Sequence, residues 1–184
     1  MRIRHALGVT AAFVLAAAVV GPVNAATTGN TTTTFTVAAT GTGLAITVPA
    51  SAALGTGAPG STITAHLGSV QVTDSRAVNP AAWTASVTST DFTNAAVTAD
   101  TIPATDVNYW SGPTTATAGS GTFTPGQPLS GGQAPLNNTT PLTAMSLTGG
   151  AGSNSASWNP TLVVNVPAAA VAGTYSGTVT HSVA

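Results

Sequence analysis

The sequence contains no cysteine, and only 4% of its 184 residues are charged. Lysine and glutamate are absent, and the basic side chains apart from histidine are Arg2, Arg4 and Arg76. Because recognition of a phosphate backbone needs a cluster of cations, this supply excludes nucleic-acid binding. The formal net charge is −1 and 43% of the residues are hydrophobic. That balance argues against disorder caused by charge repulsion and low hydrophobicity.

Without cysteine, no disulfide stabilises the fold, so a continuous hydrophobic core has to do so. Zinc sites need clustered Cys and His ligands, and His66 and His181 are not at ligand spacing. Calcium remains open, because Asp100 and Asp106 flank a short loop and carboxylate oxygens are calcium ligands. The alternative for such residues is turn capping, which we expect for Asp74. We predict neither a bound metal nor another cofactor.

The first 25 residues have the organisation of a secretory signal peptide. Arg2, Arg4 and His5 form a basic N-terminal region. Residues 6–20 form an apolar run shorter than the roughly 20 residues that span a bilayer. Residues 23–25 place small side chains at the −3 and −1 positions of a cleavage site. An uncleaved membrane anchor is the alternative. We expect cleavage after residue 25 and an exported mature chain, residues 26–184.

We expect no membrane association once the signal peptide has been removed. No apolar run after residue 25 reaches membrane length, and no LPxTG-like sorting sequence precedes residue 184. The mature protein should therefore be secreted and then either released or held noncovalently at the cell wall. The bias towards Ala, Gly, Thr, Val and Pro without lysine is typical of a GC-rich bacterial genome.

Apolar and hydroxyl side chains alternate with period two along much of the mature chain. Helix signals are almost absent, whereas threonine and valine, which favour strands, are frequent. The pattern is clearest at residues 174–183, where Tyr175, Val179 and Val183 alternate with Ser and Thr. Further runs lie at residues 35–37, 44–48, 63–67, 70–72, 83–87, 107–110, 122–124, 142–147 and 161–166. One apolar and one hydroxyl-rich face per strand predicts an antiparallel sheet with a buried and a wet side.

Clusters of Pro, Gly and Asn separate these runs, at a spacing typical of a β-sandwich or a β-barrel. Residues 111–141 are the least regular stretch, and a long loop, an insertion or a hairpin all remain open there. No composition shift marks a linker, so we predict a single domain over residues 26–184. We expect an all-β fold, an antiparallel immunoglobulin-like β-sandwich. Tyr175 should act as a tyrosine corner, with its hydroxyl bonded to nearby backbone.

Aromatic side chains give the best indication of a binding surface. Tyr109 and Trp110 are adjacent in a strand-like run, so they should point to opposite faces and one should meet solvent or a groove. An exposed Trp or Tyr offers a flat apolar surface that suits stacking on sugar rings or partner surfaces. Trp158 is expected at a turn, and Trp83 in the core. Trp110, Tyr109 and Trp158 are therefore the candidate ligand-binding residues, with packing as the alternative.

Acid–base catalysis needs titratable side chains with suitable pKa values, and the mature chain offers His66, His181 and a few aspartates. No G-x-S-x-G elbow is present, although serines are plentiful and a Ser-His-Asp set can be spread along a sequence. We expect His66 at an exposed or rim position and His181 packed with a satisfied ring. We predict no catalytic residue and no enzyme.

Short motifs over most of the mature chain resemble the WxL-domain surface proteins of Gram-positive bacteria. Residues 70–76 (VQVTDSR) are similar to the family's V-T-D-x-R-like strand and turn, and residues 82–87 (AWTASV) to its W-x-L strand. Residues 44–49 (LAITVP) look like its opening strand. Residues 167–175 (PAAAVAGTY) loosely match the stretch that precedes a second W-x-L.

Two departures from the family pattern accompany this resemblance. The first W-x-L is Trp83-Thr84-Ala85 here, and the second is His181-Ser182-Val183, without its tryptophan. The closest description is a divergent, actinobacterial-type WxL-domain secreted surface protein. The resemblance implies a sandwich fold and noncovalent attachment to the cell wall through peptidoglycan.

We therefore expect a secreted, non-enzymatic cell-surface protein that associates noncovalently with peptidoglycan, another wall polymer or other surface proteins. A structural or assembly subunit of the envelope or of an extracellular appendage is the alternative. A low-charge surface and unprotected sheet edges favour such self-association by strand addition, with residues 26–34 as the expected donor. Hydrolysis of envelope polymers ranks third.

Overall fold

The structure, a computed structural model, describes residues 31–39, 41 and 43–184. The predicted signal peptide, residues 1–25, lies outside the described residues. No helix in the described part of the chain is long and apolar enough to cross a membrane.

The chain divides into two units, Met1–Thr36 and Val37–Ala184. Residues 31–36, the described part of the first unit, are exposed and carry no assigned secondary structure. The strand predicted at residues 35–37 is wrong, because these residues have no ladder partner in the described part of the chain. A strand pattern alone forms no sheet, since each strand needs a neighbour for its backbone hydrogen bonds.

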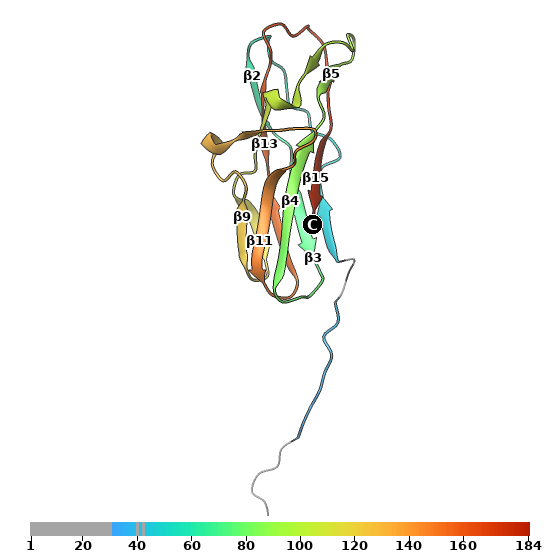
Figure 1. Cartoon of the computed structure of the whole chain (residues 1–184), viewed down its shortest axis with the longest axis vertical. Helices are drawn as coiled ribbons and strands as arrows, with labels where there is room; N and C mark the ends of the chain where they lie inside the picture. Colours follow the sequence, from blue (N-terminus) through green and yellow to red (C-terminus); the bar gives the residue numbers. More distant parts are fainter. Residues whose placement is uncertain (1–30, 40, 42) are drawn as a thin grey trace, which may run out of the picture. The chain divides into compact units, whose positions relative to one another are not determined.

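The second unit is built from four sheets, in which every strand pair is antiparallel (Figure 1). Sheet A contains, in spatial order, β1 (Leu44–Thr47), β3 (Val70–Asp74), β12 (Asn154–Trp158) and β8 (Thr114–Ala118). Sheet B contains β10 (Ala134–Pro135), β7 (Val107–Trp110), β13 (Thr161–Asn165) and β2 (Thr62–His66). Sheet C contains β15 (Val179–Val183), β4 (Ala81–Ser89), β11 (Leu142–Gly150) and β9 (Thr122–Pro125). Sheet D contains β14 (Tyr175–Ser176), β5 (Phe92–Asn94) and β6 (Thr101–Ile102).

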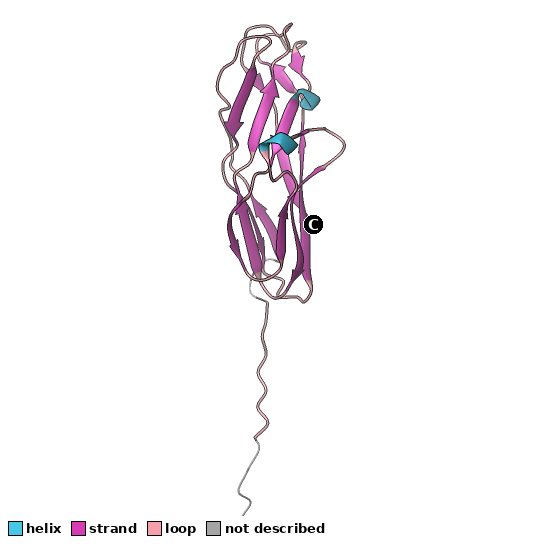
Figure 2. Cartoon of the chain, turned by 90° about the vertical axis from the view of Figure 1, so that its left-hand side faces the viewer, coloured by secondary structure: helices cyan, strands magenta, loops and turns pink. Residues whose placement is uncertain are grey.

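Helical structure among the described residues is limited to two short 3-10 turns (Figure 2), η1 (Ala104–Asp106) and η2 (Ser130–Gly132). The predicted all-β antiparallel fold is therefore confirmed. Its strands coincide with most of the alternating runs in the sequence, because one face of each strand is buried and the other is wet.

Sheets A and B are two halves of one layer. A break of two or three residues separates β2 from β3, β7 from β8, and β12 from β13. The two strands of each pair lie in different sheets, and the pairs keep the same order in sheets A and B. Sheets C and D are related in the same way, since β5 continues β4 and β15 continues β14. Each layer therefore runs the length of the second unit (Figure 1).

Side chains from both layers meet in one core. Along β4 the buried positions alternate with more exposed ones, and Trp83, Ala85 and Val87 point inward. Trp83 Nε1 in sheet C donates a hydrogen bond of 2.7 Å to Asn154 Oδ1 in sheet A. Burying a large apolar side chain contributes about 1.5–3 kcal/mol. This two-layer packing gives the unit a β-sandwich-like architecture.

The break between sheets A and B is fixed by hydrogen bonds between its two connections and by Gly68 and Pro160. The backbone N–H of Gly68 donates to Asn159 Oδ1 at 3.2 Å, and Leu67 N–H donates to the Pro160 carbonyl at 2.8 Å. Gly68 has a φ of +97°, a conformation that disfavours other residues. Proline lacks the N–H that a continuous ladder would need. The strands therefore stop here, which sets the ends of β2, β12 and their neighbours.

The irregular stretch between residues 111 and 141 combines the structures left open by the sequence. Strands β8 and β9 are joined by a tight connection at residues 119–121 that crosses between layers, and η2 and β10 follow in an excursion.

The expectation of a turn at Trp158 is wrong. Trp158 is the last residue of β12 and is fully buried, because its ring points into the core.

Candidate functional site

A row of three side chains crosses the outer face of sheet B. His66, Thr161 and Trp110 occupy paired positions on β2, β13 and β7. Side chains at paired positions project from the same face of a sheet, so these three lie side by side. His66 is exposed, Thr161 is buried between its neighbours and Trp110 is half-buried. Thr161 Oγ1 and His66 Nδ1 are 3.0 Å apart and hydrogen-bonded.

The next row on this face consists of Thr64, Val163 and Asn108, which are again paired across β2, β13 and β7. We call these six residues the sheet B face. None of the six is an Asp, Glu, Lys or Arg. The face therefore combines one indole with hydroxyl, amide and imidazole groups.

The exposed part of the Trp110 ring is hydrocarbon. Its Nε1 is buried and has no hydrogen-bond partner among the described residues. Gly112 lies against the ring, and a Cβ at this glycine would be 3.9 Å from Trp110 Cε2. Because the indole N–H is covered, only hydrocarbon atoms of the Trp110 ring meet solvent. Such a surface suits stacking rather than hydrogen bonding.

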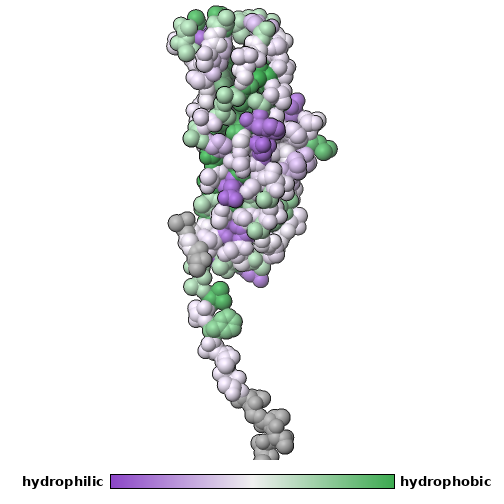
Figure 3. Space-filling view, turned by 180° about the vertical axis from the view of Figure 1, so that it is seen from behind, coloured by the Kyte–Doolittle hydropathy of each residue, from purple (hydrophilic) through white to green (hydrophobic). Residues whose placement is uncertain are grey.

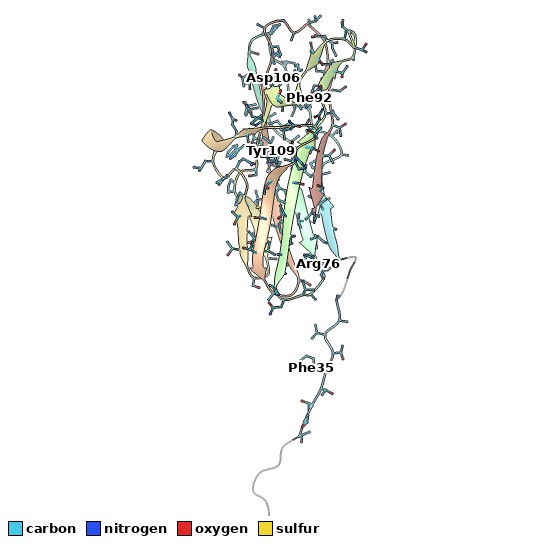
Figure 4. All side chains as sticks on the ribbon, viewed as in Figure 1. Phe35, Arg76, Phe92, Asp106 and Tyr109 are labelled. Carbon is cyan, nitrogen blue, oxygen red and sulfur yellow. The ribbon has the colours of Figure 1, made fainter. Side chains whose placement is uncertain are left out.

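Tyr109 and Trp158, the other two candidate binding residues, lie in the core with 0% exposure (Figure 4 labels Tyr109). As the alternation predicted, Tyr109 and Trp110 point to opposite faces of β7. The structure thus brings Tyr109 and Trp158 together inside and leaves Trp110 outside. Among the three, only Trp110 presents an accessible ring.

Tyr109 and Trp158 belong to a hydrogen-bonded chain that ends at His181. Trp158 Nε1 donates to the Tyr109 hydroxyl at 3.0 Å, and that hydroxyl lies 3.1 Å from His181 Nε2. Burial lowers the pKa of His181 to about 4 and raises the pKa of Tyr109. His181 is therefore neutral at pH 7. Because a hydroxyl has one donor and two acceptor sites, the Tyr109 hydroxyl can bond both Trp158 Nε1 and His181 Nε2.

The single ion pair among the described residues joins Arg76 to Asp74, the last residue of β3. Arg76 donates to Asp74 through Nε at 2.9 Å and through Nη2 at 2.8 Å, and its backbone N–H also donates to Asp74 at 3.0 Å. Asn154 Nδ2 adds a bond of 3.3 Å to the same carboxylate. The hydrogen bonds from Arg76 hold the pKa of Asp74 below its usual value. Asp74 is thus both the predicted turn cap and the partner of Arg76.

Tyr175 forms the predicted tyrosine corner. Its hydroxyl contacts the carbonyl of Val171, four residues upstream, at 2.8 Å, and also contacts the carboxylate of Asp100. The Tyr175 hydroxyl lowers the pKa of Asp100, with the Val171 N–H helping. These contacts tie the loop before β14 to the loop before β6, which is a structural role.

The described residues contain no group of three or more His, Cys, Asp or Glu side chains that could hold a metal ion. Asp100 is engaged by Tyr175 and by the Val171 N–H. Asp91 Oδ1 accepts a hydrogen bond of 2.9 Å from the backbone N–H of Ala104. These two carboxylates therefore accept hydrogen bonds from backbone N–H groups.

The two described histidines have different surroundings. The hydrogen-bond partner of His66 is Thr161, and that of His181 is Tyr109. His66 lies at an exposed position and His181 is packed, as the sequence predicted. A hydrolase of the Ser-His-Asp type needs its histidine bonded to a nucleophile and to an orienting acid. In the described part of the chain, neither histidine is bonded in that way.

The row of His66, Thr161 and Trp110 was not predicted from the sequence. His66 and Thr161 are 95 residues apart, and their proximity depends on the register of β2 against β13. Only the alternation at Trp110 gave a signal. In comparisons with known proteins, no family model matches the sequence, and no curated protein or solved structure is significantly similar to it.

Proposed function

We propose that this chain is a secreted, non-enzymatic, immunoglobulin-like β-sandwich protein that associates noncovalently with the bacterial cell wall. The wall contact is the sheet B face, and its ligand is a neutral glycan segment of peptidoglycan or another wall polymer. The row of His66, Thr161 and Trp110 carries this proposal. It places one accessible indole beside polar groups on a sheet.

This combination suits sugar rings for physical reasons. The apolar C–H face of a pyranose stacks on the hydrocarbon part of an indole, which is the part of Trp110 that is accessible. Sugar hydroxyls both donate and accept hydrogen bonds, and His66 and Asn108 offer both kinds of group. Because the face contains no Asp, Glu, Lys or Arg, binding should depend little on salt.

The wider surface supports an extracellular, low-charge role. Most of the face seen in Figure 3 is pale, the colour of residues with intermediate hydropathy, and strongly hydrophilic patches are few. The predicted signal peptide and the resemblance to WxL-domain proteins point to the same location. Trp83, the tryptophan of the first W-x-L, is 3% exposed and bonded to Asn154. We therefore assign Trp83 to the core and the wall contact to Trp110.

Co-sedimentation with purified peptidoglycan at low and moderate salt tests the proposal. The protein should sediment with the wall at both salt concentrations, and Trp110→Ala should abolish retention while Trp110→Phe keeps part of it. Gln71→Ala is the matched control, because Gln71 is an exposed polar residue in sheet A of the same layer. Retention by Trp110→Ala equal to that of the wild type would exclude this face, and no retention at all would exclude the wall ligand.

A second role, as an assembly subunit of the envelope or an appendage, is favoured by a different observation. Phe35 is 89% exposed and Val37 is 78% exposed on a segment with no strand partner among the described residues. Apolar side chains left this far in water favour association. Sedimentation analysis over a range of concentrations tests this role, and a strict monomer at high concentration would contradict it.

A further inference from the structure

A cavity of about 190 Å³ opens beside the junction of β14 and β15. Residues 48–54, which follow β1, form one wall, and Gly177, Thr178 and Val179 form another. Apolar side chains, including those of Leu67, Phe92 and Leu162, share the lining with polar groups, among them His181. An apolar cavity of about 150 Å³ holds a benzene molecule. This cavity therefore has room for one phenyl ring.

The cavity adjoins a strand edge with unused backbone groups. β15 is the edge strand of sheet C and pairs only with β4 among the described residues. Thr84 and Ala184 exchange both backbone hydrogen bonds, at 2.8 and 3.1 Å. Antiparallel pairs alternate between bonded and non-bonded, so the N–H and C=O groups of Val179 and His181 point away from β4. They are directed away from β4, next to the cavity and towards the side on which β1 approaches β15 (Figure 1).

The N-terminal segment has the complementary properties. Residues 31–39 are exposed and uncharged, and Phe35 and Val37 alternate with threonines. In a strand, Phe35 and Val37 would project from one face and Thr34 and Thr36 from the other. Phe35, labelled in Figure 4, is the largest exposed apolar side chain among the described residues. The segment therefore has a β-strand pattern but no sheet partner in the described part of the chain.

We propose that residues 34–38 of one molecule add to the free edge of β15 in a second copy and insert the Phe35 ring into the cavity there. This inference rests on the assembly role proposed above and names its contact. Backbone hydrogen bonds to Val179 and His181 supply the general affinity, and the cavity supplies the selectivity for an aromatic side chain. The proposed donor, residues 34–38, follows the donor expected from the sequence, residues 26–34. The reason is that Phe35 is the first large apolar residue after residue 34.

A second copy is the occupant that the chain itself provides. Each molecule carries both the exposed phenyl ring and the open cavity, so every copy can donate and accept. Neither the segment nor the cavity lining carries a formal charge at pH 7, so no electrostatic repulsion opposes insertion. Donation from each copy to the next continues without closing, which fits an appendage or a surface layer.

Disulfide trapping tests the contact directly, because the chain has no native cysteine. A Val37→Cys variant, which keeps Phe35 and places the cysteine on the same face of the donor strand, is mixed with a Ser51→Cys variant, whose cysteine lies at the cavity rim. Oxidation of the mixture should give a heterodimer on a non-reducing gel. The matched control replaces Ser51→Cys with Thr117→Cys. Thr117 is exposed on β8, which lies at the edge of sheet A opposite β1, the strand that precedes Ser51. Equal yields from the two mixtures, or no product from the first, would overturn the proposal.

Sedimentation velocity of the exported chain then separates this contact from the assembly role itself. Phe35→Ala should weaken self-association by about tenfold or more, since most of a phenyl ring would lose its buried environment. Leu129→Ala, which truncates another exposed apolar residue, should leave it unchanged. Association that persists undiminished in Phe35→Ala overturns the Phe35 contact but leaves the assembly role. A wild-type chain that stays monomeric overturns both. A Val37→Cys/Ser51→Cys double variant that closes within one diluted molecule overturns donation between copies.

Discussion

The hydroxyl of Tyr109 lies 3.1 Å from Nε2 of His181, a hydrogen bond that links β7 in one layer to β15 in the other. Trp158 donates to the same hydroxyl from β12. The rings of Tyr109 and His181 also pack with their centroids 5.7 Å apart. Because Tyr109 and Trp158 are both fully buried, a Trp158 N–H left unpaired by a substitution here stays away from water.

Replacing Tyr109 with phenylalanine should destabilise the fold by about 1–3 kcal/mol. The substitution keeps the packing but leaves the Trp158 N–H buried without an acceptor, which costs the desolvation of that group. Urea unfolding followed by tryptophan fluorescence measures the change. Tyr175→Phe is the comparison, since its hydroxyl lies nearer the surface and its loss should cost less. A Tyr109→Phe variant as stable as the wild type would contradict the assigned chain.

The stability of the protein should fall as the pH is lowered from about 6.5 to about 4. Burial lowers the pKa of His181 from 6.5 in the unfolded chain to about 4 in the fold. Between these values the unfolded state binds more protons than the folded state, so stability rises with pH through this window and is complete above it. The effect amounts to at most about 3 kcal/mol, from 1.36 kcal/mol for each pKa unit.

Urea unfolding at intervals between pH 4 and pH 7 measures this dependence. His181→Gln should flatten the curve in that window, because the titrating group is gone. His66→Gln is the control, since it removes an imidazole from the exposed sheet B face. If His66→Gln flattened the curve and His181→Gln did not, the assignment to His181 would be wrong.

Replacing Asp74 with asparagine should destabilise the protein by about 2 kcal/mol at pH 7. The substitution weakens the charge-assisted bonds from Arg76, and such bonds contribute roughly 1.5–3 kcal/mol. The pKa of Asp74 is below its ordinary value of 3.8 in the folded state. Its contribution is therefore present above pH 3.8 and is lost as the pH falls through the folded pKa.

The test is the difference in unfolding free energy between Asp74→Asn and the wild type at pH 7 and in acid. That difference should shrink once the carboxylate is protonated. Asn154→Ala, which removes a neutral partner of Asp74 and Trp83, should show a loss that depends less on pH. A constant difference for Asp74→Asn at all pH values would count against the charged pair.

Much of the fold could be predicted, because period-two alternation reports directly which face of each strand is buried. Trp83 and Val87 follow that pattern and lie where it predicts. The last run, residues 174–183, is extended as predicted but is divided into β14 and β15, which belong to different sheets. The failures are positions where a neighbour decides the outcome. Residues 35–37 carry a strand pattern but have no ladder partner among the described residues. Trp158 precedes an Asn-Pro break that resembles a turn but ends a core strand.

The candidate site was predicted only in part, because it depends on register. Alternation placed Tyr109 and Trp110 on opposite faces of β7 but did not say which of them faces the core. Packing of sheet B against sheet C decides it, since Tyr109 reaches His181 across the core. His66 joins Trp110 through Thr161 only because β2 and β7 both pair with β13, and no local pattern encodes that pairing.

Two glycines of the excursion between β9 and β10 should respond to alanine in opposite ways. A Cβ at Gly126 would overlap the carbonyl oxygen of Thr143, and the Gly126 N–H donates to the Ala144 carbonyl at 2.9 Å. The backbones therefore have to separate, and Gly126→Ala should destabilise the protein by about 2 kcal/mol or more. A Cβ at Gly131 would meet nothing within 4 Å, so Gly131→Ala should stay within about 0.5 kcal/mol of the wild type. Thermal unfolding of both variants measures the contrast. Because they lie in one excursion, equal stabilities would show that the excursion does not pack closely on β11.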